Sequence, residues 1–175
     1  MKTLILCIVL TVLGSNFTFG QLIKPGDRPD TLVTDSGTFR ALIRGKVTQG
    51  TYAMGEVMEH MNYMTSLHRH NTFDESIYVL SGYMTVHIQG KTHRLGAGSS
   101  IFIPKGTPHA QGNLDPEPVR FLFTMAPSAG FEGFMEGRAE VLKTTKPGTT
   151  EFMKKVMVLV PNLDLEVLGP SPVKR

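Results

Sequence analysis

Cysteine and tryptophan are almost missing from this chain of 175 residues, which has one cysteine, Cys7, and no tryptophan. A lone cysteine excludes an internal disulfide and a zinc site made of several thiolates. Runs of basic residues are also missing and the net charge is only +3, so nothing indicates a nucleic-acid partner. Glycine and proline are plentiful, with 18 and 11 residues, which predicts many turns and short strands.

Residues 1–20 have the layout of a secretory signal peptide. Lys2 gives a positive start, residues 4–13 are almost entirely apolar, and Thr18 and Gly20 lie where a signal peptidase would cut. A membrane anchor is the alternative, but the apolar run is too short to cross a bilayer. We therefore expect a secreted protein, extracellular or periplasmic, that begins at Gln21 and has no membrane attachment after cleavage.

The mature chain is expected to form one domain, because its length leaves little room for two. Residues 21–38 are rich in proline, aspartate and glycine and predict an extended N-terminal segment. Residues 39–175 would then be a single domain with a helical tail. Cleavage also removes Cys7, so the hydrophobic core alone must hold this domain together.

Short apolar runs bounded by turn residues predict a series of strands in the first part of that domain. The strands are expected at 39–44, 51–60, 75–80, 83–89, 99–103 and 118–125. Two short helices are expected at 131–137 and 149–160, with Thr149 or Thr150 as the cap of the second. The predicted fold class is therefore all-β, an antiparallel barrel or sandwich with short C-terminal helices.

Two histidines and a glutamate have spacing that suits a metal ion. His68 and His70 are two positions apart, so both imidazoles face the same side of an extended segment. Glu75 follows after a stretch that could turn the chain back toward them, which would put two histidines and a carboxylate on one first-row metal. Taken alone, the pair fits equally well with two surface histidines beside a loop.

A second pattern changes that balance. The first cluster fits H-x-H-x4-E-x6-G, ending at Gly82, and residues 98–113 fit G-x5-P-x-G-x2-H-x3-N, with His109 as the histidine. These are the two signatures of the cupin superfamily in the correct order, and the chain resembles that superfamily over about residues 53–126. One position departs from the family pattern, since Asn62 stands where a glycine is usual. Asparagine tolerates left-handed backbone, so the turn is expected to persist.

The resemblance implies a cupin-type antiparallel β-barrel, or jelly roll, with a metal inside. By position, the ligands of one divalent cation would be His68, His70, Glu75 and His109. An all nitrogen and oxygen set suits Mn, Fe, Co, Ni, Cu or Zn and does not choose among them. Asn113 would be a structural hydrogen bonder, and a homodimer is compatible with the resemblance.

Two other groups of residues are expected to have structural roles. His87 has the opposite parity to the apolar residues of its predicted strand, so it should point outward and not bind metal. The methionines between the second strand and the first histidine motif are better explained by core filling than by soft-metal binding. They are Met54, Met58, Met61 and Met64.

Among cupins the chain is most similar to the quercetin dioxygenase-like group, on the runs 74–82, 104–109 and 131–134. That similarity implies a metal-dependent oxidoreductase that uses dioxygen on a small, aromatic or enolic substrate. Glu75 would leave coordination and act as the catalytic base, which is reasonable because the metal sets its pKa.

Two alternatives stay open, so the sequence favours an enzyme without establishing one. The first is a non-catalytic secreted cupin that binds or stores a small molecule. The second is a germin-like manganese enzyme, although germins have a cysteine pair near the mature N-terminus that this chain lacks.

Overall fold

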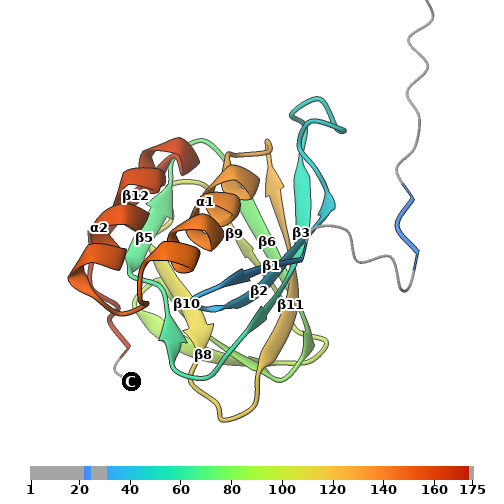
Figure 1. Ribbon diagram of the computed structural model, residues 1–175. Helices are drawn as coiled ribbons and strands as arrows, with labels where there is room; N and C mark the ends of the chain where they lie inside the picture. Colours follow the sequence, from blue (N-terminus) through green and yellow to red (C-terminus); the bar gives the residue numbers. More distant parts are fainter. Residues whose placement is uncertain (1–21, 25–30, 174–175) are drawn as a thin grey trace, which may run out of the picture.

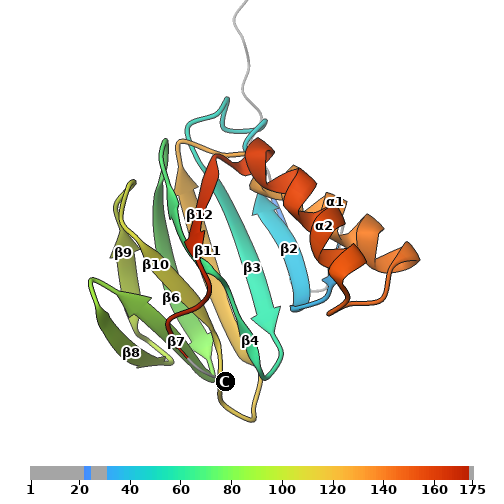
Figure 2. The same ribbon diagram turned by 90° about the vertical axis from the view of Figure 1, so that its left-hand side faces the viewer.

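The computed structural model describes residues 22–24 and 31–173, and the expected signal peptide at 1–20 lies outside them. Two β-sheets face each other around a hydrophobic core, and two helices lie side by side against one flank (Figures 1 and 2). Within these residues, no helix is long and apolar enough to span a membrane. The fold is the expected all-β jelly roll with C-terminal helices.

The first sheet has six antiparallel strands and forms the wall on which the core is built. In spatial order they are β1 (Thr31–Thr34), β2 (Gly37–Ile43), β3 (Ala53–Glu59), β11 (Val119–Ala126), β6 (Asp74–Ser81) and β9 (Ser100–Ile103). Strand β11 shows the pattern that builds the wall, because buried and more exposed residues alternate along it. Its inward residues are Val119, Phe121, Phe123 and Met125.

The second sheet carries both histidine motifs. In spatial order its strands are β12 (Leu165–Gly169), β5 (Leu67–His70), β10 (His109–Asn113), β7 (Tyr83–Ile88) and β8 (Lys91–Gly96), and β4 (Tyr63–Met64) also pairs with β10. Among the residues described, no strand pairing joins the two sheets, so the barrel is not closed by hydrogen bonds.

Helix α1 (Phe131–Thr144) packs against β1 of the β1–β2 hairpin, and α2 (Thr150–Leu159) packs against α1. The short helix η1 (Val160–Leu163) leads into β12. Thr149 caps α2 as expected, because its side chain accepts a hydrogen bond from the Phe152 backbone N–H. Helix α1 is longer than predicted, since residues 138–143 are mostly strong helix formers that continue it past Gly137.

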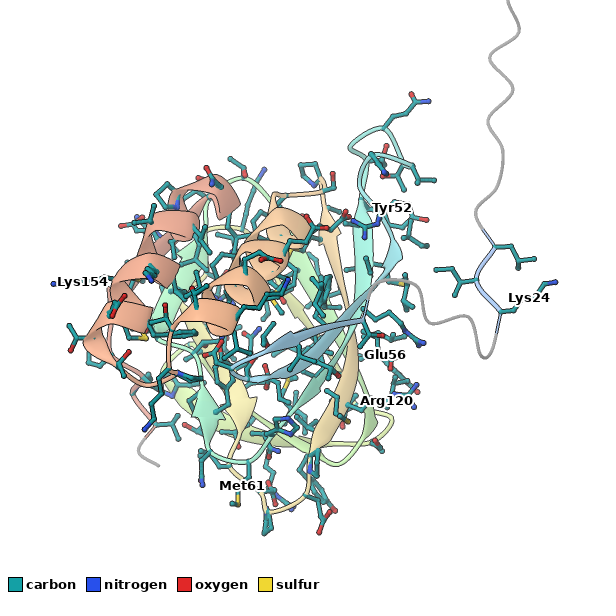
Figure 3. All side chains as sticks on the ribbon, viewed as in Figure 1. Lys24, Tyr52, Glu56, Met61, Arg120 and Lys154 are labelled. Atoms are coloured by element: carbon teal, nitrogen blue, oxygen red, sulfur yellow. The ribbon has the colours of Figure 1, made fainter. Side chains whose placement is uncertain are left out.

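All six predicted strands are present, and each boundary is within two residues of the prediction. Six further strands were missed, namely β1, β4, β5, β8, β10 and β12. Most are very short, and β8 and β12 are largely exposed, so they lack the apolar alternation that marks a strand. The core-filling role holds for Met64, which is buried, whereas Met54 and Met58 are only half-buried. It is wrong for Met61, which is 50% exposed and lies at the edge of the molecule (Figure 3).

Candidate metal centre

The four predicted ligands come from three strands and meet inside the barrel. His68 and His70 lie on the same face of β5, while Arg69 between them points outward and pairs with Glu166 on β12. His109 opens β10 next to His68 in register, and Glu75 lies on β6 in the opposite sheet. All four residues are buried, with 4% exposure or less.

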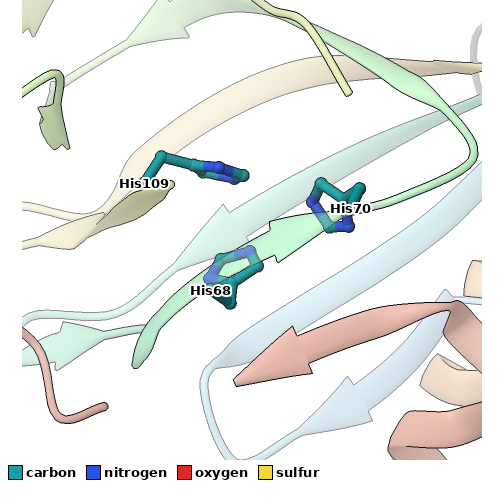
Figure 4. Close-up of side chains that lie close together, drawn as sticks. All are labelled: His68, His70 and His109. Carbon is teal, nitrogen blue, oxygen red and sulfur yellow. The ribbon is translucent and has the colours of Figure 1, made fainter. Parts of the chain in front are cut away.

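The three imidazoles point toward one another (Figure 4). Ring centroids are 4.3 Å apart for His68 and His109, 5.0 Å for His68 and His70, and 5.1 Å for His70 and His109. One nitrogen from each ring lies within 4.8 Å of the others, a spacing that could hold a metal ion. The Glu75 carboxylate joins them, with Oε2 3.3 Å from Nε2 of His70 and 3.5 Å from Nε2 of His109.

Backbone carbonyls orient two of the rings. Nδ1 of His68 lies 2.8 Å from the Ser66 carbonyl oxygen, and Nδ1 of His109 lies 2.9 Å from that of Thr107. A carbonyl can only accept, so Nδ1–H donates in both rings and Nε2 keeps its lone pair for the interior. Metal-binding histidines in proteins are held in this way.

Several buried polar atoms at the centre have no hydrogen-bond partner. They are Nδ1 and Nε2 of His70, Nε2 of His109 and Oε2 of Glu75. Leaving a polar group buried and unpaired costs about 1–3 kcal/mol each, which a folded core rarely accepts. A divalent cation would give Nε2 and Oε2 a common partner, so these residues fit the metal that the sequence predicts.

The charges of the site suit a cation. Burial, together with the neighbouring His109 and His70, lowers the pKa of His68 to about 4, so at neutral pH this ring is an uncharged donor. Burial alone would raise the pKa of Glu75, but the imidazoles of His109 and His70 outweigh it and hold that pKa well below its usual range. The site therefore presents an anionic carboxylate.

The turns around the ligands behave as the motifs predict. The Gly106 backbone N–H donates to the His70 carbonyl at 2.6 Å, and Lys105 N–H donates to Asp74 Oδ1 at 2.8 Å, so the two motifs are joined directly. Asn62 has φ of 65°, which is the left-handed turn expected of it. His87 is half-buried and bonded to Thr92, away from the three clustered histidines.

Asn113 is the structural hydrogen bonder that the motif implies. It is fully buried, and its side-chain amide donates to the carbonyls of Glu59 and Glu117 at 3.3 and 2.8 Å. Its Oδ1 accepts from Asp115 N–H at 2.9 Å. These bonds tie the end of β10 to β3 and to the loop that follows, and so help to fix the strand that carries His109.

A cavity of about 420 Å³ lies beside the ligands and is lined by His68, His70 and Glu75. Much of its wall is apolar, and includes Val57, Phe121, Phe123, Phe131 and Phe134. The cavity also has a polar group that the sequence analysis missed: Asp35, Glu59, Tyr63, Gln111 and Arg138. Two of these residues could have been noticed from their positions in the elements. Glu59 alternates in phase with the inward residues of β3, and Arg138 lies on the buried face of α1.

Comparison with known proteins agrees with this geometry. Residues 56–125 match the family model of the cupin domain, a segment that contains all four predicted ligands. Residues 56–125 are therefore a cupin domain. This domain contains the predicted metal ligands of both motifs, and the two sheets bring them together as described above.

Three similar proteins are the following. An uncharacterized protein of Methanocaldococcus jannaschii is 26% identical over 102 residues, which is 58% of this chain and 82% of the relative. The polyketide cyclase RemF of Streptomyces resistomycificus is similar in structure, with a TM-score of 0.53 and 27% identity over 62% of this chain and 80% of that one. KdgF of Halomonas sp. shares the fold, with a TM-score of 0.51 and 20% identity over 59% and 92% of the two chains.

Proposed function

We propose that this cupin is a metal-dependent oxidoreductase that uses dioxygen on a small aromatic or enolic molecule. One observation carries the proposal: three buried imidazoles and a carboxylate converge beside a cavity of about 420 Å³. Four protein donors leave room on a first-row metal for further ligands, and an open position distinguishes a catalytic metal from a structural one.

The cavity wall supports a planar, ring-bearing substrate. Phe121 and Phe123 from β11 and Phe134 from α1 line it, and Phe131 packs edge-on against Phe123 with centroids 4.6 Å apart. Aromatic walls favour the flat face of a ring and disfavour a phosphorylated sugar, which needs several cationic or amide donors. An enol or phenol would place its hydroxyl among the four ligands and its ring among the phenylalanines.

Glu75 is the residue best placed to move a proton. When bound, a divalent metal supplies Lewis acidity and a common position for substrate and dioxygen. The substrate hydroxyl would lose its proton to Oε2 of Glu75, while the three imidazoles stay fixed by their strands. A divalent cation held by these residues would lower the pKa of Glu75 while its carboxylate is a ligand, so Glu75 would act as the base after leaving coordination. Both oxygen atoms of dioxygen would enter the product as the substrate is oxidised.

A second reaction is favoured by one specific observation. The similarity to RemF, described as a polyketide cyclase, supports a ring closure without net oxidation in the same cavity. Such a reaction would use the same ring-binding wall and the same base, and it would consume no dioxygen. Oxygen consumption therefore separates the two reactions.

The test is oxygen uptake and product analysis by metal-loaded and metal-stripped protein with flavonols, catechols and β-diketones. We expect uptake only with the loaded protein and only with compounds that present an enol or phenol. Conversion without uptake would replace oxidation by cyclisation. Tight binding of a compound without any conversion would instead favour the non-catalytic binding cupin.

Secretion is part of the same proposal. It is supported by the charged, apolar and small-residue order of residues 1–20. N-terminal sequencing of protein exported by an expression host should give Gln21 or a neighbouring residue as the first. Recovery of Met1 on the exported protein would contradict it.

A further inference from the structure

Glu59 is a buried carboxylic acid that the metal centre does not use. It is the last inward residue of β3, where the preceding inward positions are Ala53, Gly55 and Val57. The residue is 6% exposed and lines the cavity, and its Oε2 atom is fully buried without a hydrogen-bond partner. A purely structural acid at this depth would be expected to have a partner.

Gln111 supplies a second unpaired oxygen on the opposite sheet. It is the inward residue of β10 between His109 and Asn113, so it lies about 7 Å along the strand from His109. Its backbone N–H bonds to Thr65, but its Oε1 is buried without a partner while the side chain lines the same cavity. Asn113, the next inward residue, donates to the Glu59 carbonyl. The inward residues of β10 therefore extend from the candidate metal centre toward Glu59.

The register of the first sheet places Glu59 away from the ligands. Along β11, Glu75 is the partner of Met125 and Glu59 is the partner of Val119. The two carboxylates therefore lie toward opposite ends of that strand, with the side chains of Phe121 and Phe123 between them. A ligand that reaches both must carry polar groups at both ends and an apolar ring between them.

The nearby cation is already neutralised and does not call for an anionic ligand. Arg138 on α1 donates to Asp35 Oδ1 through Nε at 3.1 Å and Nη2 at 2.5 Å, and through Nη1 to the Tyr63 hydroxyl at 3.3 Å. Glu59 itself is mostly protonated near neutral pH, because burial raises its pKa to about 8. The positive charge of Arg138 acts to lower this pKa, and the negative charge of Glu75 acts to raise it. A protonated carboxyl both donates and accepts a hydrogen bond, and the amide of Gln111 can do the same.

We propose that Glu59 and Gln111 form a second binding subsite, which holds the distal hydroxyl groups of a neutral, ring-bearing substrate. The orientation rests on the proposed function, with the enol or phenol end of the substrate at His68, His70 and Glu75. A distal carboxylate is disfavoured, since it would lie near Glu59 with its nearest cation already bound to Asp35. The subsite thus selects hydroxylated rings over bare or carboxylated ones.

The experiment measures equilibrium binding of two flavonols to metal-loaded protein by fluorescence titration. Quercetin carries hydroxyls on both ring systems, whereas unsubstituted flavonol keeps only the hydroxyl–ketone pair that would lie at the metal centre. The variants are Glu59→Leu, Gln111→Leu and Glu59→Gln. The control is Glu117→Gln, whose side chain is exposed on the neighbouring loop. Thermal melts establish whether each variant is folded. If Glu59→Leu does not fold, Glu59→Gln and Gln111→Leu provide the test.

We expect the wild type and Glu117→Gln to bind quercetin at least about tenfold more tightly than flavonol, the effect of one or two hydrogen bonds. Glu59→Leu should bring this ratio close to one by weakening quercetin alone. Gln111→Leu should reduce the ratio, and Glu59→Gln should keep part of it because an amide still bonds to hydroxyls.

The subsite proposal is overturned if the ratio of quercetin to flavonol affinity is unchanged in Glu59→Leu and Gln111→Leu. It is also overturned if these variants lose affinity for both flavonols equally, or if the wild type binds neither flavonol. Equally tight binding of a flavonol carboxylate overturns its preference for neutral ligands. The two proposals fail separately. Hydroxyl preference without oxygen uptake leaves the subsite standing and overturns oxidation, whereas uptake without preference overturns the subsite alone.

Discussion

Glu75 and His70 face each other across the two sheets of the barrel, with Oε2 of Glu75 3.3 Å from Nε2 of His70. They are only five residues apart, and the turn between them brings Phe73 against the His70 ring at a centroid distance of 4.2 Å. One short crossing therefore supplies two of the predicted ligands, one from each sheet. The rest of the site depends on a strand pairing, since His109 is the register partner of His68.

Metal content should depend on each of the clustered histidines. His70→Ala or His109→Ala removes one of four donors, so we expect stoichiometry after dialysis to fall from about one metal per chain to a small fraction. Folding should largely persist, because the core is built from the apolar faces of both sheets. Elemental analysis of the purified variants measures the change.

His87→Ala is the matched control, because His87 lies on β7, adjacent to β10, yet is bonded to Thr92 outside the cluster. Its metal content should equal that of the wild type. A loss of metal in His87→Ala as large as that in His109→Ala would show that the ligand assignment is wrong.

Glu75→Gln should separate metal binding from turnover. The amide oxygen can still face the metal but is a very poor base, so we expect partial metal occupancy and a loss of turnover of about 100-fold or more. Oxygen uptake normalised to bound metal gives the comparison. Full turnover per metal in Glu75→Gln would remove Glu75 from the reaction.

Most strands of the first sheet could be predicted from sequence, and so could the position of the candidate metal site. Residues 119–126 alternate so regularly that β11 follows from the period alone, and His68, His70 and His109 follow from two spaced motifs. By contrast, β8 has no apolar face to mark it. It forms because the turn at Gln89 and Gly90, both with positive φ, folds it back on β7.

The polar end of the cavity could not be predicted in the same way. Asp35, Glu59 and Arg138 are far apart in the sequence and belong to no motif, and only the docking of α1 on the β1–β2 hairpin joins Arg138 to Asp35. The parity of Glu59 marks it as inward but does not show whether it has a partner. That information depends on side-chain packing between elements, which local sequence does not carry.

Arg138 should be a major contributor to stability. Arg138→Met keeps much of its volume but leaves Asp35 without its buried partner, so we expect a loss of about 3 kcal/mol and a fall in Tm of roughly 6–12 °C. Lys143→Met is the control on the same helix, since its pair with Glu140 is exposed and should change stability by less than about 0.5 kcal/mol. Equal Tm values for the two variants would contradict a stabilising role for the Arg138–Asp35 pair.

Two glycine substitutions should have opposite effects on stability. A Cβ at Gly112 would lie 2.0 Å from the Tyr63 carbonyl oxygen, a backbone atom of β4 that cannot move alone. We expect Gly112→Ala to cost at least about 2 kcal/mol. At Gly133, inside α1, a Cβ would meet open space, so Gly133→Ala should gain roughly 0.5–1 kcal/mol. Urea denaturation of both variants measures the difference, and a stable Gly112→Ala would mean that β4 does not pack on β10 as described.

Glu59 should make the protein less stable as pH rises toward 8. Its pKa is about 8 in the folded chain against an ordinary 4.5, so between these values the folded state holds a proton that the unfolded state has lost. The stabilising contribution is complete below about pH 4.5 and is lost as pH rises through 8, at up to roughly 1.4 kcal/mol per pH unit. The charged neighbours act in known directions, since Arg138 favours ionisation of Glu59 and Glu75 opposes it.

Glu59→Gln replaces this acid by a group of the same shape that does not titrate. We expect the free energy of unfolding of Glu59→Gln to rise relative to that of the wild type between pH 5 and 8, while Glu117→Gln stays parallel to the wild type. Taking the difference between variant and wild type cancels His68, whose low pKa acts in the opposite direction in both proteins. Urea titrations at several pH values give this difference curve. A difference curve for Glu59→Gln that does not change with pH would mean that Glu59 is already ionised at neutral pH. The second subsite would then not contain a protonated carboxyl group.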